Sequence, residues 1–253
     1  MEPDNLNKEQ DQNSWAVNAW TLLSKLRDQS PLIQCITNFV SMDLMANTLL
    51  SAGASPAMIH SIEEIQDFTP HVHALCINVG TLSPAWLPAM REAAQVANKA
   101  GKPWVLDPVA AGASSFRLKA CLELVGLKPS VIRGNGSEII ALSKASIGAT
   151  KIALMSQWMQ WKRRKSLAQS SGAIVAVSGA VDIITDGHRV VGAHNGSLHD
   201  AKDHGHRMCC HCPYCCICCR RSIACIGSNS FSIVYILALL ERWEWPWPKV
   251  LLH

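Results

Sequence analysis

The chain lacks any long hydrophobic run: none of its 253 residues lies in a stretch approaching the eighteen or more apolar residues of a membrane span. Its first thirteen residues are polar and acidic, and no arginine precedes Arg27. The sequence therefore shows neither the apolar core of a secretory signal nor the basic pattern of a transit peptide. Internal repeats are absent as well. We expect a cytoplasmic protein with no membrane contact.

Charged residues are scarce, at 17% of the chain, and hydrophobic residues make up 49%. This composition suits one globular domain with a large core. The net charge of +4 comes largely from residues 162–165 and from Arg220-Arg221. A basic cluster usually forms a solvated face, and nucleic-acid binding would need a groove or an aromatic platform beside it. We expect no nucleic-acid partner.

Cysteine and tryptophan are rare in most of the chain and crowded in a few places. Eight of the eleven cysteines lie between Cys209 and Cys225, and five of the nine tryptophans fall within residues 158–161 and 243–247. The other three cysteines are scattered and are expected to be small buried hydrophobes: Cys35, Cys76 and Cys121. The composition of the chain therefore changes in its second half.

Short apolar runs alternate with helical patterns along the regular part of the chain. The strand-like runs are Leu32–Ile36, Ala57–Ile59, Ala74–Val79, Trp104–Leu106, Val131–Ile132 and Ile174–Val177, and the helical patterns include Met42–Gly53, Pro84–Ala100 and Phe116–Val125. This alternation predicts an α/β fold with a parallel sheet covered by helices on both faces. Two further runs, Ile183–Thr185 and Val190–Ala193, flank Asp186-Gly187 and predict a closing hairpin.

Two carboxylates stand at predicted strand or helix ends. Asp107 ends an apolar strand before Pro108 and a loop of small residues, and Glu138 lies in the first turn of a helix that opens near Asn135. Each has a purely structural alternative, since Asp107 can bind loop amides and a helix dipole favours Glu138 whatever the function. Together they suit a hydrated magnesium ion, which takes one or two carboxylates plus substrate phosphates.

Other polar groups are expected at the same edge of the sheet. Arg133 precedes Gly134 at a strand end, where its guanidinium could reach phosphate oxygens, although a surface ion pair is the commoner role. Ser178-Gly179 offers a hydroxyl and an amide at another strand end. The first strand stops at Thr37-Asn38, and the second delivers Met58, a residue that is core in most proteins. The carboxyl edge of an open α/β sheet is where ligands bind.

These motifs, in this order, resemble the hydroxyethylthiazole kinase family, the thiamine-salvage branch of the ribokinase-like fold. The resemblance rests on residues 30–58, 104–113, 131–138, 177–179 and 194–196, and it extends over residues 30–150 and 165–196. It implies a ribokinase-like three-layer sandwich and ATP-dependent phosphorylation of 4-methyl-5-(2-hydroxyethyl)thiazole.

The resemblance also implies site roles and partners. Asp107 and Glu138 correspond to the family's magnesium carboxylates, and Arg133 and Ser178 to its ATP contacts. Met58 corresponds to the thiazole contact and Asn38 to a position that lines the pocket. Mg²⁺ as cofactor, ATP as phosphoryl donor, the thiazole alcohol as substrate and a homotrimer are implied in the same way.

The family's catalytic element is missing from the place where the resemblance puts it. A Gly-Cys motif at a helix N-terminus should follow residues 194–196 by about fifteen residues, but residues 203–210 read DHGHRMCC. We therefore assign no catalytic residue. The sequence departs from the family pattern in residues 152–164 and 197–253.

Alternative reading frames recover family-like sequence at three places. Read from the second codon base, residues 198–219 can become SMMQKITATGCAVTALIAAFVA, in which the cysteine spanning Met208 and Cys209 is forced. Read from the third base, residues 153–164 can become SHESMDAVEAAK, and residues 237–251 can become GIAGEMGMAMAKGPA. We call the protein that carries these three strings the frame-restored chain.

Small insertions or deletions in a kinase gene are the interpretation we favour, because alanine, valine and methionine codons readily give cysteine and tryptophan when read out of frame. Residues 1–196 then form the kinase domain, and residues 197–253 replace its C-terminal helices with an aberrant Cys/Trp-rich tail. The competing interpretation is a zinc module, since residues 209–219 contain Cys-x-x-Cys spacings, but no separated second ligand pair accompanies them. A binding protein without catalytic activity, or a misfolded product with this tail, is the alternative function.

Overall fold

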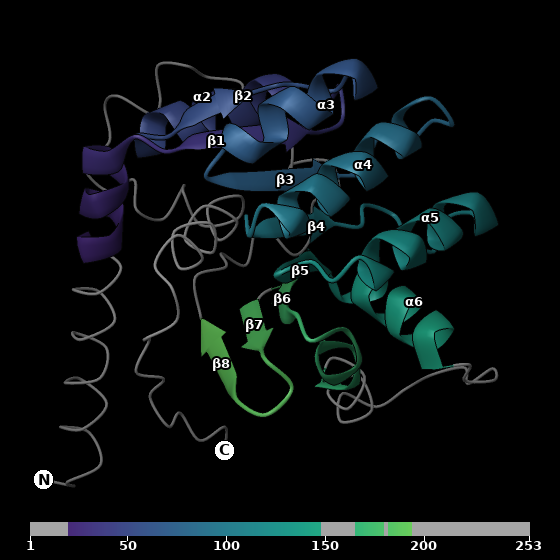
Figure 1. Cartoon of the computed structure of the whole chain (residues 1–253). Coiled ribbons are helices and arrows are strands. Elements are labelled where there is room, and N and C mark those ends of the chain that lie inside the picture. The colour runs from purple at the N-terminus through teal and green to yellow at the C-terminus, as the bar shows by residue number, and fades with distance from the viewer. Residues whose placement is uncertain (1–19, 148–164, 180–181, 194–253) are drawn as a thin grey trace, which may run out of the picture.

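A computed structural model of the chain describes residues 20–147, 165–179 and 182–193. Within these ranges, the chain forms one eight-stranded sheet with helices packed against it (Figure 1). The strands follow the order β2-β1-β3-β4-β5-β6-β7-β8. Their bounds are β1 Leu32–Ile36, β2 Ser55–Ala57, β3 Ala74–Asn78, β4 Trp104–Asp107, β5 Val131–Asn135, β6 Ile174–Ser178, β7 Asp182–Thr185 and β8 Val190–Ala193.

The sheet is parallel from β2 to β6, and β7 and β8 close it as an antiparallel pair. The predicted hairpin after residue 182 is thereby confirmed. Because β1 to β6 all run in one direction, their carboxyl ends meet along a single edge. That edge gathers the residues that follow each strand.

Helices cover both faces of the sheet. One face carries α3 (Ile62–Phe68), α4 (Trp86–Lys99), α5 (Ser115–Gly126), α6 (Gly136–Ile147) and the helix at residues 165–171, with a short 3-10 turn, η1 (Thr69–His71), after α3. The other face carries α2 (Met42–Ala52) and the helix at residues 20–29. Figure 1 shows α3 to α6 in a row beside the sheet and α2 next to β2.

Alternating side chains of each central strand supply the two layers of the core. In β3, Leu75 and Ile77 join the cluster with α4, while Ala74 and Cys76 join the cluster with α2. Strands that are apolar on both faces are typical of a parallel sheet buried between helices. The predicted three-layer α/β arrangement is confirmed for the described residues. Three cysteines expected to be buried hydrophobes are indeed buried and free: Cys35, Cys76 and Cys121.

Some strand limits differ from those expected. The second strand is Ser55–Ala57 rather than Ala57–Ile59, so Met58 follows the strand instead of lying inside it. Strand β5 continues through Arg133 and Gly134 to Asn135, where we expected it to stop at Ile132. The continuation arises because β6 pairs with all five residues of β5. Arg133 is therefore held within the sheet.

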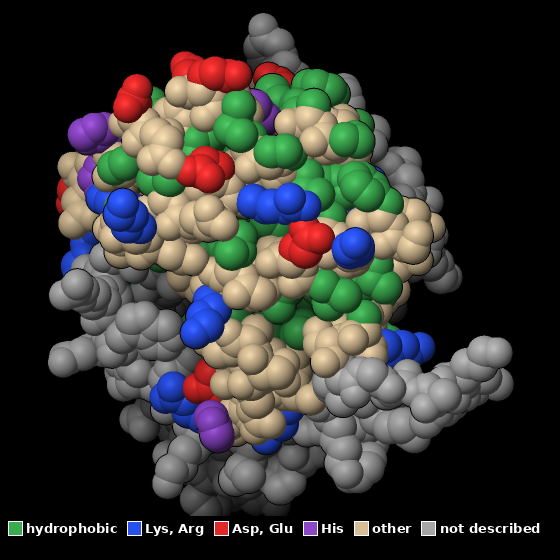
Figure 2. Space-filling view, turned by 45° about the vertical axis from the view of Figure 1, so that its right-hand side comes forward, with side chains coloured by type: hydrophobic (Ala, Val, Ile, Leu, Met, Phe, Trp, Pro, Cys, Tyr) green, Lys and Arg blue, Asp and Glu red, His purple; other side chains and the backbone are tan. Residues whose placement is uncertain are grey.

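The exposed surface carries charges of both signs. Figure 2 shows basic side chains separated by neutral, apolar and acidic ones on the face turned toward the viewer, wherever the side chains are described. Among the helices that the structure describes, none is both long and apolar enough to cross a membrane.

Gly53 ends helix α2 in a left-handed conformation, with φ of 99°. Its N–H approaches the carbonyls of Leu49 and Leu50, so it satisfies carbonyls at the helix end. A Cβ at this position would lie 2.7 Å from Cγ and 2.9 Å from Cα of Arg27. Glycine is required here by both conformation and space.

We expect Gly53→Ala to lower the free energy of unfolding of the frame-restored chain by about 1–3 kcal/mol, because the left-handed conformation strains any residue with a Cβ. Urea denaturation measures the change. Gly126→Ala is the matched control: a Cβ there meets nothing within 4 Å, and the substitution should raise stability by up to about 1 kcal/mol. Equal effects of the two substitutions would contradict this account of Gly53.

Candidate active site

Asp107 ends β4 at the centre of the sheet's carboxyl edge, directly opposite Asn78 of β3. One carboxylate oxygen, Oδ2, accepts hydrogen bonds from Asn78 Nδ2 at 2.9 Å and from Arg133 Nη1 at 3.3 Å. The other oxygen, Oδ1, is buried and has no partner. The side chain is only 15% exposed. A buried oxygen without a partner is costly, so this atom marks a position where a ligand would be stabilising.

Burial raises the pKa of Asp107 to about 6. The Arg133 guanidinium opposes this rise, whereas the nearby Glu138 carboxylate adds to it. A cation at the bare oxygen would favour the ionised form. The environment of Asp107 therefore suits a carboxylate that binds a positive ligand.

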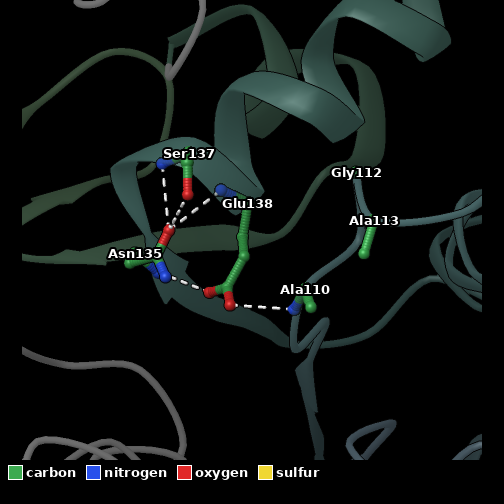
Figure 3. Close-up of a pocket in the computed structure, with 6 residues that line it drawn as sticks. All are labelled: Ala110, Gly112, Ala113, Asn135, Ser137 and Glu138. Atoms are coloured by element: carbon green, nitrogen blue, oxygen red, sulfur yellow. Dashed lines mark hydrogen bonds between the residues drawn. The ribbon is translucent and has the colours of Figure 1, made fainter. Parts of the chain in front are cut away.

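Glu138 forms a capping box with Asn135 at the start of α6. The N–H of Asn135 donates to Glu138 Oε2 at 2.7 Å, and the N–H of Glu138 donates to Asn135 Oδ1 at 3.0 Å. The second oxygen, Oε1, accepts the N–H of Ala110 at 2.9 Å (Figure 3). Glu138 thus joins the loop after β4 to the start of α6. Its structural role, which the sequence left open, is present alongside any metal-binding role.

These two segments enclose a hollow of about 400 Å³. Its lining residues are Ala110, Gly112, Ala113, Asn135, Ser137 and Glu138. Figure 3 shows the Glu138 carboxylate between Asn135 and Ala110, with Gly112 and Ala113 on the opposite wall. Ala110 has φ of 54° although it is not glycine, a strained conformation of the kind that collects at functional sites. Small side chains and a helix N-terminus make this hollow suitable for an anion such as phosphate.

The two residues expected to contact ATP lie on neighbouring strands. Arg133 is on β5, and its side chain is 20% exposed while it pairs with Asp107. Ser178 ends β6 beside Asn135, and its Oγ lies 3.5 Å from the carbonyl oxygen of Gly134. A Cβ on Gly134 would lie 3.0 Å from Glu138 Oε2. The close approach of this strand to Glu138 therefore depends on glycine.

The two residues expected near the thiazole lie at the other end of the same edge. Asn38 follows β1 and is 9% exposed, while Met58 follows β2 and packs against the cluster beneath α2. His60 joins these loops, because its Nε2 accepts the N–H of Thr37 at 3.3 Å and its Nδ1 lies 3.0 Å from the carbonyl oxygen of Met58. The accepting role of Nε2 makes Nδ1 the donor of a neutral ring.

Sequence reasoning missed three residues that hold this edge together: Asn78, His60 and Arg117. The guanidinium of Arg117 donates to the carbonyls of Val79, Gly80 and Val109, so it ties the loop after β3 to the loop after β4. The only available signal was position, since Asn78 ends an apolar strand just as Asp107 does. Nothing in the sequence around Arg117 indicates its partners.

The donor set at this edge fits a magnesium ion with few protein ligands. Asp107 Oδ1 is the open buried oxygen, and Glu138 faces the neighbouring hollow with both oxygens already accepting amides. No group of three or more His, Cys, Asp or Glu side chains suited to a metal occurs among the residues whose structure is described. Magnesium commonly takes one or two carboxylates and completes its shell with water and phosphate.

A family model described as the hydroxyethylthiazole kinase family matches residues 23–221. This range includes every site residue named above. The chain belongs to the hydroxyethylthiazole kinase family. The ribokinase-like fold and kinase class expected from the sequence are thereby confirmed.

Individual hydroxyethylthiazole kinases are similar to this chain in sequence and in structure. The Arabidopsis thaliana enzyme is 66% identical over 189 residues, which cover 74% of this chain and 68% of that protein. The Zea mays enzyme is 56% identical, covering 72% and 65%. A solved hydroxyethylthiazole kinase from Pyrococcus horikoshii OT3 superposes with a TM-score of 0.65 at 39% identity, covering 71% of this chain and 67% of that one. The matches span about two thirds of the relatives' length.

The raised pKa of Asp107 predicts a stability cost at high pH. A carboxyl whose pKa is about 6 in the folded state and has an ordinary value of 3.8 stabilises the fold fully below pH about 4, and this contribution is lost as pH rises through about 6. Asp107→Asn should therefore raise the unfolding free energy of the frame-restored chain at pH 8, by at most about 3 kcal/mol, and raise it less at pH 5.

Asp186→Asn provides the control with opposite sign. Partial burial raises the pKa of Asp186, but backbone hydrogen bonds from Arg189 and His188 outweigh it and hold the pKa below its ordinary value. Removing that charge should destabilise the protein at pH 8. Urea titrations of both variants at pH 5 and pH 8 test the pair. A loss of stability in Asp107→Asn that is the same at both pH values would refute the buried-charge interpretation.

Proposed function

We propose that this protein transfers the γ-phosphoryl group of ATP to the hydroxyl of 4-methyl-5-(2-hydroxyethyl)thiazole, as a step of thiamine salvage. The observation that carries the proposal is the 66% identity to a hydroxyethylthiazole kinase across a segment that includes Asp107, Arg133 and Glu138. The site geometry supports it, because the partnerless oxygen of Asp107 and the hollow lined by Glu138 belong to the same edge of the sheet, where the Glu138 charge acts on Asp107.

Phosphoryl transfer requires positioning and charge neutralisation more than covalent chemistry from the protein. Magnesium, when bound, would neutralise phosphate charge, with Asp107 and Glu138 as the residues that hold it. Arg133 and Ser178 would hold the nucleotide phosphates from β5 and β6, and the guanidinium also keeps Asp107 Oδ2 occupied. The N–H groups of Ser137 and Glu138 already donate to Asn135 Oδ1, and the positive end of the α6 dipole favours negative charge at this place.

The substrate side of the proposed site is formed by Asn38 and Met58, next to the His60 ring. The His60 ring lies against the Trp86 ring at a tilt, with ring centroids 4.7 Å apart, and Trp86 also contacts Phe39 edge to face. Phe39 and Val40 are 66% and 68% exposed. This apolar rim beside the site supports the homotrimer expected from the family, with sites near subunit contacts. A cytoplasmic location is part of the same proposal.

We also propose that residues 152–164 and 197–253 are out-of-frame sequence and that residues 1–196 carry the kinase domain. Both segments lie entirely outside the described residues, and so do residues 208 and 209, which the recovered cysteine codon spans. Support comes from the three alternative-frame strings. The sequence as it stands, which we call the printed chain, lacks the family's Gly-Cys element. It therefore has the proposed substrate-binding residues without that element.

The printed chain should therefore show no measurable thiazole-dependent ADP formation and should fold poorly, while the frame-restored chain should be active. Losing one preorganised oxyanion donor costs roughly 100- to 1000-fold in rate, and losing the whole element should cost more. A coupled ADP assay on both purified proteins makes the comparison. Comparable activity would refute the frame interpretation, and inactivity of both would count against the kinase assignment.

Elemental analysis tests the competing zinc module. If the tail is out-of-frame sequence, the purified printed chain should hold no stoichiometric zinc, and one tightly bound zinc per chain would favour the zinc module.

In the frame-restored chain, Arg133→Ala should weaken ATP binding by about 1.5–3 kcal/mol, because it removes charge-assisted hydrogen bonds to phosphate. Isothermal titration calorimetry measures the affinity. Arg91→Ala is the matched control, since Arg91 lies on α4 and pairs with Glu123 of α5. Unchanged ATP affinity in Arg133→Ala would remove Arg133 from the site and leave it as the partner of Asp107.

A further inference from the structure

Two buried asparagines connect the tip of β1 to Asp107, and backbone amides determine how each is oriented. Asn38 Oδ1 accepts the N–H of Ser41 at 2.9 Å, so its Nδ2 donates to Asn78 Oδ1 at 2.8 Å. Asn78 Oδ1 also accepts the N–H of Gly80 at 2.9 Å. A backbone N–H can only donate, so neither side-chain amide can be turned over. Nδ2 of Asn78 must therefore face Asp107.

The result is an asymmetric carboxylate. Asp107 Oδ2 accepts from Asn78 and from Arg133, while Oδ1 is buried and accepts from nothing in the protein. A partial rotation of the carboxylate would break both hydrogen bonds, and a half-turn would only exchange its two equivalent oxygens. The donors therefore fix the plane of the carboxylate and leave one oxygen position without a protein donor. Asn78 itself is 5% exposed and cannot readily move.

The link to Asn38 is equally constrained. A Cβ on Gly80 would lie 2.7–2.8 Å from three atoms of the Asn38 side chain. Only glycine lets the loop after β3 approach Asn38 this closely. Three adjacent strands, β1, β3 and β4, are joined in this way by side-chain hydrogen bonds at their carboxyl ends.

We propose that Asn78 is a positioning residue for the reaction: it holds the Asp107 carboxylate so that the oxygen without a protein donor can bind a divalent cation, and it connects this carboxylate to Asn38 on the thiazole side. This inference rests on the proposed function. Asn78 would contact neither substrate nor metal, and it would act through Asp107. Partners behind a metal ligand commonly change metal affinity or activity by 10- to 100-fold when they are removed.

The test is the affinity for Mn²⁺, the probe that stands in for Mg²⁺, measured by electron paramagnetic resonance of free Mn²⁺. Asn78→Ala should raise the dissociation constant about tenfold or more. Gln34→Ala is the matched control: Gln34 is a fully buried amide on β1, bonded to Thr69 and to the carbonyl of Ile59 and to none of the residues in this chain of bonds. It should leave Mn²⁺ affinity unchanged. The measurements use the full printed chain and the frame-restored chain.

A double-mutant cycle separates positioning from a general loss of structure. In an Asp107→Asn background, Asn78→Ala should change residual Mn²⁺ affinity little, because the ligand it positions is gone. If circular dichroism shows that Asn78→Ala is unfolded, the Mn²⁺ affinity is measured for Asn78→Ser instead, whose hydroxyl is a shorter hydrogen-bond donor.

Four results would each overturn the proposal. The Asn78 variants could keep their Mn²⁺ affinity, or Gln34→Ala could lose as much affinity as Asn78→Ala. Asn78→Ala could also lose as much affinity in the Asp107→Asn background as in the parent chain, or neither parent chain could bind Mn²⁺. Failure of the proposed function gives a different result. A frame-restored chain whose Mn²⁺ affinity depends on Asn78 but which forms no thiazole-dependent ADP would contradict the kinase assignment and leave the positioning of Asp107 intact.

Discussion

The site is organised around one buried carboxylate that the protein satisfies on only one side. Asp107 receives two donors at Oδ2 and none at Oδ1. A protein gains nothing in stability from such an arrangement, since burial disfavours the charge and the bare oxygen lacks a partner. The arrangement becomes favourable only when a cation arrives. The surrounding elements can be understood as the structure needed to keep this carboxylate buried, charged and correctly turned.

Main-chain groups account for much of that structure. Glu138 accepts two backbone amides, Asn78 accepts one, and Arg117 donates to three backbone carbonyls. A loop held through its backbone can change its side chains without losing its path. Holding the loops in this way strains the backbone locally, as in the left-handed conformation of Ala110. This strain is offset by the apolar layers on both faces of β3 and β4, which fix the strand ends from which the loops depart.

The fold was predictable because its signals are local and redundant. Apolar runs such as Leu32–Ile36 stand between helical patterns, and Gly53 marks a helix end through a conformation that few other residues tolerate. The ends of strands that depend on pairing with a neighbouring strand were harder to predict. Strand β5 runs on through Arg133 because β6 offers it partners, and no property of residues 131–135 alone contains that information.

The site was predictable in its members but not in its connections. Asp107 and Glu138 were named from their positions at element ends, yet the sequence could not say that Arg133 pairs with Asp107 or that Glu138 caps α6. Asn78 was missed altogether, because an amide at a strand end has no chemistry of its own. Its importance comes from its hydrogen bonds to Asn38, Asp107 and the N–H of Gly80, of which Asn38 lies forty positions away along the chain. Residues that bind ligands leave local signals in a sequence, whereas residues that orient them become recognisable only once the strands have been placed side by side.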